Sequence, residues 1–337
     1  MADDYLVLGD MQVPSTVFQG YVQQKTKELS KLLSSGIAIN NPSLDILASS
    51  GGKQVTLPFF KDLTGNSVLW DETLDIEVNP ITTSKDIARL LLREKSWGST
   101  DLSSDLTGTD PMTVIGNSVA GFWARDEQTT MIQILAGVFA DNLANDSGDL
   151  IHDISSASIA STTDSTRISG SAIIDGFALL GDASDSLTHI AMNHATFTFL
   201  NKQNLIATIQ ASVTQGVHQT YMGKIVVVDD AVPTRAGGTD GVIHSAFLYG
   251  AGAFGVGYGK VSHPIETDRD STGGGGRDIL ITRVNKIIHP MGFAWQEASV
   301  AKDSPTNAEL ATASNWDRVV DKKQCKLARL DFNLENA

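Results

Sequence analysis

The chain has 337 residues, 41% of them hydrophobic, with 39 acidic and 25 basic side chains and a formal net charge of −14. This length allows two or three packed units with a sizeable core, and the acidic balance argues against tight nucleic-acid binding, which needs Lys and Arg to neutralise phosphates. No apolar run reaches the ~20 residues that cross a bilayer, the start "MADDYLVLGD" lacks the basic region of a secretory signal, and the single cysteine, Cys325, excludes an intrachain disulfide and fits a reducing cytoplasm.

The first sixty-odd residues combine an amphipathic helix with extended chain. Residues 15–34 carry a narrow apolar stripe at helical spacing, made of Phe18, Val22, Leu29, Leu32 and Leu33. This stripe predicts a helix that Gly36 ends and that packs on a neighbour rather than on a core of its own. Residues 53–60 alternate as a strand does, and "DLTGN" at 62–66 has the composition of a turn.

Charge is segregated in the next segment. Four acids, Asp71, Glu72, Asp75 and Glu77, surround a short predicted strand, and four bases follow at Lys85, Arg89, Arg93 and Lys95. Like-charge runs are usually solvated faces, and the alternative is complementary pairing between copies of the chain, which would set register. Local propensity favours a helix over residues 86–94 whereas the flanking pattern permits a strand, so the residues alone leave this element open.

Residues 110–143 predict the longest helix. Asp110 suits the N-cap position and Pro111 the first helical position. Apolar residues then recur at helical spacing, at Ile115, Val119, Phe122, Ile132, Leu135 and Phe139. At 1.5 Å per residue such a helix is about 50 Å long, which suits the backbone of a large flat domain.

Helical and extended patterns alternate irregularly in the rest of the chain, which indicates an α+β fold. The expected elements are a loop or hinge at 145–170, helices at 171–182 and 194–206, and strands at 187–192, 223–233, 242–250 and 292–296. "STGGGGRD" at 271–278 predicts a hairpin loop. Thr306 and Glu309 have the T-x-x-E spacing of a capping box.

The segment "YGAGAFGVGYGK" contains G-x-G-x-x-G at Gly250, Gly252 and Gly255, the spacing of a dinucleotide-binding turn. Such a turn must follow a strand and open a helix. A strand does precede it, but Gly257 and Gly259 would fall in the first helical turn, where each costs about 1 kcal/mol relative to Ala. We therefore expect two short strands whose glycines allow close approach, and no bound nucleotide.

No residue pattern predicts catalysis, a cofactor site or a metal site. The sequence has no G-x-S-x-G, Walker or H-E-x-x-H motif and no Cys/His cluster. Asp229 and Asp230 end a predicted buried strand, where active sites often lie, but a polar turn explains them better. His189 and His194 are placed too far apart to converge, and Cys325 reads as an ordinary packed or surface residue. We therefore expect a protein that is not an enzyme.

A set of segments, taken in order, resembles the major capsid proteins of tailed bacteriophages and prophages. They are "VTLPFFKDLTG" (55–65), "DLTGTDPM" (105–112), "FWARDEQTTMIQILAGVFAD" (122–141), "AIIDGFALLGDASDSLTHIAMNHATF" (172–197), "YMGKIVVVDDAVP" (221–233), "AFLYGAGAFGVGYG" (246–259), "ITRVNKIIHPMGFAW" (281–295) and "SPTNAELATASNWDRV" (304–319). The ordered set, rather than any single segment, carries the resemblance.

The resemblance implies the fold that tailed-phage capsids share with encapsulins. In this chain it implies an N-terminal arm at 1–50, an extended β-hairpin loop at 51–98, a peripheral domain with a long spine helix at 99–145 and 262–337, and an axial domain at 146–261 that includes the glycine motif. It also resolves residues 86–94 as extended. Some relatives join subunits by Lys–Asn isopeptide bonds, but no motif fixes such a pair here.

The implied function is a structural subunit of pentamers and hexamers in an icosahedral virion shell. Scaffolding and portal proteins are the expected partners, DNA is enclosed without sequence-specific contacts, no membrane is involved, and assembly takes place in the bacterial host cytoplasm. Two alternatives remain: an encapsulin-like compartment subunit with enzyme cargo, and a nucleotide-binding enzyme.

Overall fold

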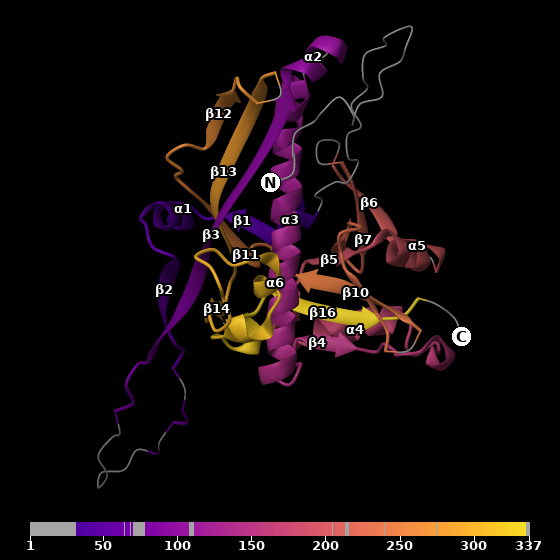
Figure 1. Cartoon of the computed structure of the whole chain (residues 1–337). Coiled ribbons are helices and arrows are strands. Elements are labelled where there is room, and N and C mark those ends of the chain that lie inside the picture. Colours follow the sequence, from indigo (N-terminus) through magenta and orange to yellow (C-terminus); the bar gives the residue numbers. More distant parts are fainter. Residues whose placement is uncertain are drawn as a thin grey trace.

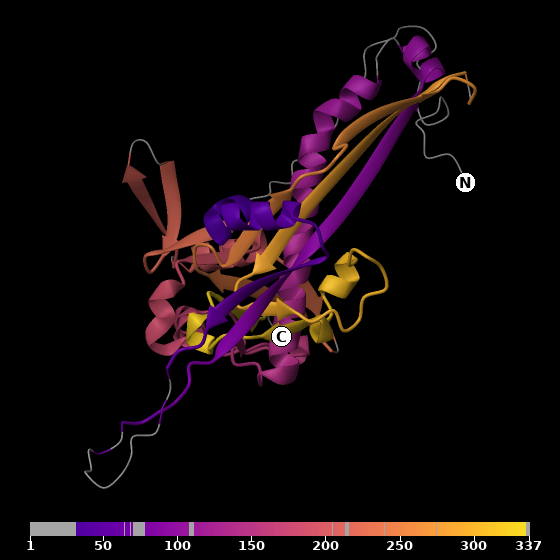
Figure 2. The ribbon, with the colours of Figure 1, turned by 90° about the vertical axis from the view of Figure 1, so that its left-hand side faces the viewer.

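A single long helix organises the molecule. The computed structural model describes residues 32–334 except 64, 68, 70–77, 108–110, 204, 213–215, 239 and 274. Helix α3 (Pro111–Asn145) runs through the centre, with one sheet on each side of it (Figure 1). The view turned by 90° shows strands running beside one half of α3 and a loop projecting beyond the opposite end (Figure 2).

The other helices are short. They are α1 (Pro42–Ser49), α2 (Asp101–Thr107), α4 (Gly170–Ala178), α5 (His194–Lys202) and α6 (Asn307–Leu310), with a π-helical turn at Leu33–Ile37 and 3-10 turns at Ile159–Ser161, Gly181–Ser186, Ala313–Asn315 and Lys322–Gln324. None of the helices described here combines the length and apolar character needed to cross a membrane.

A six-stranded sheet lies on one side of α3, in the order β1-β11-β13-β3-β2, with β12 paired to β13. Its strands are β1 (Ala38–Asn40), β2 (Gln54–Phe60), β3 (Thr83–Thr100), β11 (Phe254–Gly259), β12 (Ile265–Asp270) and β13 (Arg277–Pro290). β3 and β13 form a long antiparallel ribbon whose pairing runs from Arg277 opposite Thr100 to Ile287 opposite Leu90. This ribbon lies beside the N-terminal half of α3 (Figure 2).

An eight-stranded sheet lies on the other side, in the order β4-β16-β10-β5-β8-β7-β6, with β9 paired to β10. Its strands are β4 (Ile151–Asp153), β5 (His189–Met192), β6 (Ala207–Ser212), β7 (Gly216–Tyr221), β8 (Lys224–Val228), β9 (Thr234–Ala236), β10 (Val242–Tyr249) and β16 (Leu327–Phe332). A small third sheet pairs β14 (Phe293–Trp295) with β15 (Trp316–Arg318). The central strand β10 is almost wholly buried, as its apolar and aromatic composition predicts.

The two halves of α3 have different environments. From Gln128 to Asn142 most of its side chains are buried, and this half packs into the main core together with β10 and β16. A helix that is apolar on most sides has to be buried in this way. The N-terminal half contacts the six-stranded sheet through Phe122, whose ring meets Trp97 of β3 edge-to-face at 5.1 Å, and through Trp123, whose Nε1 donates to Thr282 Oγ1 at 3.2 Å.

Most predicted elements are confirmed. The long helix, both shorter helices, the strands at 187–192 and 242–250, and the hairpin at 271–278 are present, and residues 86–94 lie inside β3. The capping box is present, because Glu309 N donates to Thr306 Oγ1 and Thr306 N donates back to the Glu309 carboxylate. The predicted arm helix up to residue 31, the Asp110 cap and the acids at 71–77 lie outside the described residues.

Helix α1 packs directly against the glycine-rich strand β11. No helix follows these glycines; β11 continues as a strand to Gly259 and pairs with β13. Gly255, Gly257 and Gly259 face one side of β11, where an added Cβ would come within 2.8, 2.6 and 2.6 Å of Leu44 Cδ1, Leu44 Cβ and Ala48 O of α1. Alternate glycines therefore let a helix lie directly on a strand.

Replacing Gly257 by Ala is expected to destabilise the subunit by about 1–3 kcal/mol, the usual range for overpacking. The new Cβ would meet backbone atoms of α1, Leu44 C at 2.7 Å and Asp45 N at 3.0 Å, which cannot rotate away. Urea unfolding of the soluble subunit measures the loss. Gly238→Ala is the control, because an added Cβ there would lie at an ordinary 3.5 Å from Ala157 Cβ. Equal stability of the two variants would contradict the close packing of α1 on β11.

The expected domain ranges do not coincide with the sheets. The range 146–261 was expected to contain the glycine motif in an axial domain, but β11 belongs to the six-stranded sheet with β3 and β13. In the same way β16, within the range 262–337, pairs with β10 and β4 of the eight-stranded sheet. The chain thus passes between the two sheets within both ranges, and the domain division itself stays a prediction.

Candidate assembly surfaces

The loop between β2 and β3 projects away from the rest of the subunit (Figures 1 and 2). The large apolar side chains described on it and at its base are more than half exposed, at 57–92%: Phe60, Leu63, Leu69, Val78 and Ile81. Contiguous exposed apolar side chains on a soluble protein mark interaction surfaces. A projecting loop of this composition is therefore a candidate contact with another protein.

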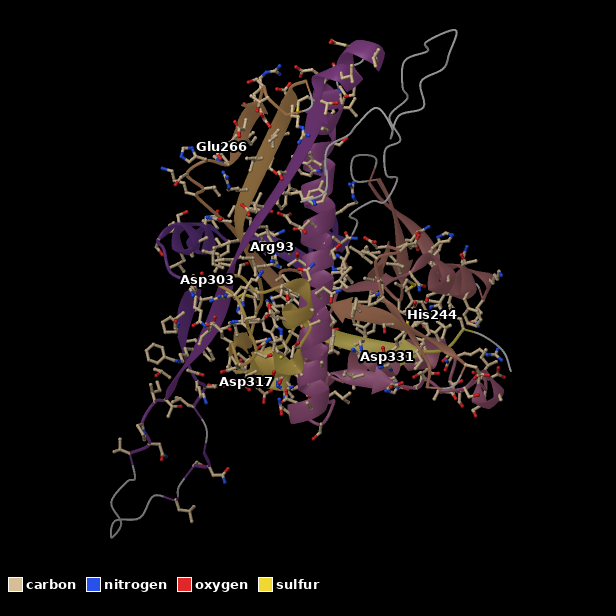
Figure 3. The ribbon with its side chains drawn as sticks, viewed as in Figure 1. Arg93, His244, Glu266, Asp303, Asp317 and Asp331 are labelled. Atoms are coloured by element: carbon tan, nitrogen blue, oxygen red, sulfur yellow. The ribbon has the colours of Figure 1, made fainter. Side chains whose placement is uncertain are left out.

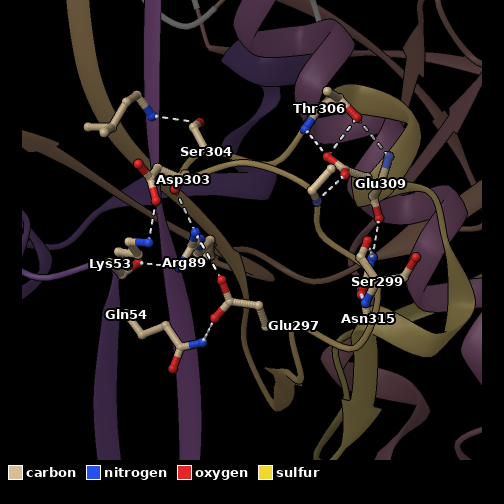
Figure 4. Close-up of polar contacts among 12 residues, drawn as sticks. Lys53, Gln54, Arg89, Glu297, Ser299, Asp303, Ser304, Thr306, Glu309 and Asn315 are labelled. Atoms are coloured by element: carbon tan, nitrogen blue, oxygen red, sulfur yellow. Dashed lines mark hydrogen bonds and ion pairs between the residues drawn. The ribbon is translucent and has the colours of Figure 1, made fainter.

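The β2–β3 pair that carries this loop is clamped by a buried guanidinium at the end away from the loop, where Arg89 lies opposite Gln54 (Figure 4). The Arg89 side chain is 2% exposed; its Nη2 donates to Asp303 O at 2.6 Å and lies 3.2 Å from Glu297 Oε1, and its Nη1 donates to Lys53 O at 3.3 Å. Gln54 Nε2 donates to the other Glu297 oxygen, and Lys53 pairs with the Asp303 carboxylate. β2 and β3 are thus tied to a segment more than 200 residues away in sequence.

Arg89→Met is expected to destabilise the subunit by about 2–4 kcal/mol, because it removes a buried charge and leaves Asp303 O and Glu297 Oε1 without the donor that they have in the folded subunit. Urea unfolding measures this. Lys53→Met is the control from the same cluster: its ion pair joins side chains that are 60% and 80% exposed, so the loss should stay below about 1 kcal/mol. Similar losses in both variants would contradict the clamp.

Two of the four segregated bases, Arg89 and Arg93, have partners within their own subunit. Arg89 is buried within its own subunit, and Arg93 Nη2 donates to Asn307 Oδ1 at 3.1 Å. Figure 3 shows Arg93 of β3 and Asp303 of the C-terminal segment on the same side of α3. Of the four bases, Lys85 and Lys95 are exposed, Arg93 is half-buried and Arg89 is buried, so pairing between copies would rely mainly on the two lysines.

A second candidate surface lies at the opposite end, where α2 caps the β12–β13–β3 ribbon (Figure 1). Arg269 of β12 holds α2 in place, with Nη2 at 2.5 Å from Asp101 Oδ2 and Nη1 at 2.7 Å from Asp278 Oδ1. On this end Leu102 and Leu106 of α2 are about half exposed. The long subunit thus presents apolar side chains at both of its ends.

The residues considered for catalysis have structural partners instead. Asp229 accepts hydrogen bonds from Leu32 N, Gln128 Nε2 and Ala231 N, and Asp230 accepts one from His194 N. His189 stacks on the Tyr249 ring at 5.2 Å. Within the part of the chain that the structure describes, no three His, Cys, Asp or Glu side chains are grouped to hold a metal ion.

Other polar groups are also committed to pairs. Asp331 is fully buried in the eight-stranded sheet (Figure 3), with its carboxylate between Arg235 and Arg329 at 3.1 and 3.0 Å. Cys325 is buried, and burial raises the pKa of its thiol to about 12, which leaves it protonated and unreactive at neutral pH. These arrangements support packing rather than chemistry.

An open hollow of about 690 Å³ lies between the end of α3 and residues 318–323. Its main cation, Arg318, is paired with Asp149 at 2.8 Å and with Asp146 at 3.2 Å. Burial favours the neutral carboxyl of Asp149, but hydrogen bonds from Arg318 and Asn142 outweigh it and hold the pKa below its usual value. The charges of Arg318, Asp146 and Asp149 therefore neutralise one another at the edge of this hollow.

Sequence reasoning predicted that the glycines allow close approach, but it missed the Arg89 clamp and the packing of helix α1 on these glycines. One signal was available: Arg89 interrupts the apolar run "IARLLL", and a charge inside such a run indicates a buried pair. Its partners at 297–303 are too distant in sequence to be found by spacing.

Comparison with known proteins supports a single assignment. A family model described as "Major capsid protein 13-like" (Gp13-like) matches residues 108–326. The major capsid protein of Bacillus phage SPP1 is 35% identical over 333 residues, covering 98% of this chain and 99% of that protein. The fold is similar to the Ralstonia phage GP4 capsid (TM-score 0.62, 12% identity, 98% of both chains) and to the cyanophage Pam1 capsid (TM-score 0.59, 13% identity, 99% of both chains).

The resemblance inferred from the ordered segments is thus confirmed over nearly the whole chain, and a shell role accounts for the exposed apolar ends that a lone subunit would leave in water. The chain belongs to the Gp13-like family of phage major capsid proteins, and its role is that of a structural subunit of a capsid shell.

Proposed function

We propose that the chain forms pentamers and hexamers of an icosahedral shell that encloses the double-stranded DNA of a tailed bacteriophage, without catalytic activity of its own. The observation that carries the proposal is the loop at 61–82: the β2–β3 pair that carries it is clamped to its own subunit through Arg89, while the apolar side chains of the loop are exposed. A strand pair anchored in its own subunit, with an exposed apolar loop at its end, suits a contact with a neighbouring copy. Obligate interfaces of this kind bury more than about 2,000 Å².

The domain division proposed for the assembled subunit keeps the ranges expected from the sequence, except that one strand is exchanged in each direction so that the division follows the sheets. Residues 1–50 would form the arm, 51–98 the extended loop with its base, 99–145 and 262–337 the peripheral domain, and 146–261 the axial domain around the symmetry axes. Because β11 lies in the six-stranded sheet and β16 in the eight-stranded sheet, we assign β11 to the peripheral domain and β16 to the axial domain.

The proposed partners follow from the shell. A net charge of −14 supports enclosure of DNA without tight binding, since phosphates would be repelled rather than neutralised. A scaffolding protein would guide assembly in the host cytoplasm, and a portal protein would occupy one vertex. The finished protein would reside in the virion.

Expression of the full chain, alone and with its scaffolding protein, tests the proposal. Sedimentation and negative-stain electron microscopy should show closed shells or ring-shaped capsomers. A stable monomer at every concentration and with every scaffold would overturn it. Shells purified from the native host should contain DNA; shells filled with a single enzyme would favour the compartment alternative.

A further inference from the structure

The N-terminal half of α3 is held to the ribbon of β3 and β13 by a few individual side chains. Each residue from Met112 to Glu127 is partly or largely exposed, although the ribbon runs beside this half of the helix (Figure 2). Burial of apolar surface therefore contributes less here than in the half that begins at Gln128. The alignment of helix and ribbon must rest on directed contacts.

Lys286 of β13 is the fully buried member of these contacts. Its side chain is 0% exposed, and its Nζ donates to Asp126 Oδ2 at 2.8 Å. The same Nζ lies 5.9 Å from the centroid of the Trp123 ring, within the range of a cation–π contact. From one strand, Lys286 therefore holds two positions of α3 that lie almost one turn apart.

The sheet register directs Lys286 toward α3. Lys286 lies opposite Leu91 of β3 and Tyr258 of β11, and residues directly opposite one another project to the same face of a sheet. Leu91 packs in the main core with α3, and Tyr258 Oη donates to Glu127 Oε2 at 3.2 Å. Lys286 thus occupies the middle strand at the point where the sheet meets α3.

Trp123 extends this contact along the helix. Its ring meets Phe122 edge-to-face at 5.3 Å, and Phe122 in turn meets Trp97 of β3 at 5.1 Å. Loss of Lys286 would free one face of the Trp123 ring, so the aromatic contacts beyond it would lose part of their fixed geometry.

The buried pair of Lys286 and Asp126 constrains geometry more than it stabilises the fold. Taking two charges out of water costs about as much as their attraction returns, and replacing both by apolar residues is often neutral for stability. A charge-assisted hydrogen bond fixes a distance and a direction, whereas apolar contacts are non-directional. The pair is therefore suited to align the ribbon with the helix.

We propose that Lys286 is the positioning residue that fastens the ribbon to the N-terminal half of α3, so that these two long elements behave as one rigid unit. A subunit of this kind presents its α2 end in one fixed direction, which closed shells of uniform diameter require. This second step rests on the proposed shell function, whereas the first step concerns the single subunit.

The test replaces the pair as a unit, with Lys286→Met and Asp126→Leu in the full-length chain. Asp126 is 24% exposed, so the larger Leu has room at the surface. Spin labels at Ser271→Cys, in the turn between β12 and β13, and at Ala120→Cys of α3 occupy exposed positions and report the distance between ribbon and helix. The buried Cys325 thiol, whose pKa burial raises to about 12, does not take the label at neutral pH.

The distribution of distances between the two labels should be at least about twofold broader in the paired replacement, because an apolar contact does not fix direction. The urea midpoint of the soluble subunit should move by less than about 0.5 M, since the pair contributes little net stability. Electron microscopy should show at least about a tenfold loss of closed shells of uniform diameter under conditions in which the natural chain assembles.

Two variants in the same sheet serve as controls. Lys95→Met makes the same change at an exposed lysine of β3. Tyr258→Phe removes the neighbouring hydrogen bond to Glu127 and keeps the ring. Both variants should keep the width of the distance distribution within about 1.3-fold of the natural chain, because exposed polar contacts contribute little, and both should form normal shells.

An unchanged distance distribution in the paired replacement would overturn the inference, and so would an equal broadening in Tyr258→Phe. An insoluble subunit, or a urea midpoint lower by more than about 0.5 M, would make the pair part of the core instead of a positioning contact. Broader distances with normal shells would refute its role in assembly. If the natural chain itself forms no shells, the proposed function fails, and the distance comparison still decides whether Lys286 fastens the ribbon.

Discussion

Replacing residues 62–81 by Asn-Gly is expected to abolish shell formation and to leave a cooperatively folding subunit. β2 and β3 pair with Phe60 opposite Thr83, and Lys61 N donates to Thr82 O at 2.9 Å. Lys61 and Thr82 are therefore a hydrogen-bonded pair of the kind that flanks a two-residue type I′ turn. A roughly tenfold shorter loop costs less entropy to close, so stability should be unchanged or higher by up to about 2 kcal/mol.

The assembly loss follows from the five exposed apolar side chains at 60–81, four of which the change removes. Urea unfolding measures the subunit, and sedimentation with electron microscopy measures the shells. A full-length control, Leu69→Ser with Val78→Ser, keeps the loop and removes two apolar contacts, and it should weaken assembly without changing subunit stability. Normal shells from the shortened chain would show that the loop makes no needed contact, and a subunit that does not fold would show that it belongs to the core.

The sequence predicted the elements that are determined by residues close together in the chain. The helix at 111–145 has a proline at its start and apolar residues at helical spacing over many turns, so few alternatives exist. Helix α1 was missed although Asn41 and Pro42 are a standard helix start and Asn41 Oδ1 accepts from Ser43 N at 3.0 Å. An eight-residue helix is marginal alone. Helix α1 is stabilised by packing on the glycines of β11, which lie more than 200 residues away in the sequence.

Strand β16 escaped prediction for a different reason. "LARLDF" places charges at Arg329 and Asp331, and a strand with charges on it reads as exposed. In the structure Asp331 is fully buried, bonded to Ser245 Oγ at 2.6 Å and paired with Arg235 and Arg329. Two of the three partners come from β9 and β10, so only the folded chain reveals that these charges are satisfied inside the sheet.

Gly137→Ala is expected to cause the largest loss of stability of any small substitution in α3. An added Cβ would lie 2.2 Å from Leu310 O and 2.6 Å from Trp316 Nε1, and these two atoms already share a hydrogen bond of 2.8 Å. Trp316 is also fixed from its other side, edge-to-face on the buried Trp295 at 5.0 Å. The helix must therefore move away from α6 and β15, at a net cost of about 3 kcal/mol or more, even after the ~1 kcal/mol that Ala gains over Gly in a helix.

Gly116→Ala on the same helix is the matched control, with the opposite sign. Gly116 is exposed and an added Cβ would meet nothing within 4 Å. Only the helix-propensity gain remains, so this variant should be more stable by about 0.5–1 kcal/mol. Thermal and urea unfolding of both soluble subunits should separate them by roughly 4 kcal/mol, the sum of the two expected changes. A Gly137→Ala subunit as stable as Gly116→Ala would mean that α3 does not rest on the Leu310–Trp316 contact, and that the spine helix can shift against the β14–β15 side without loss.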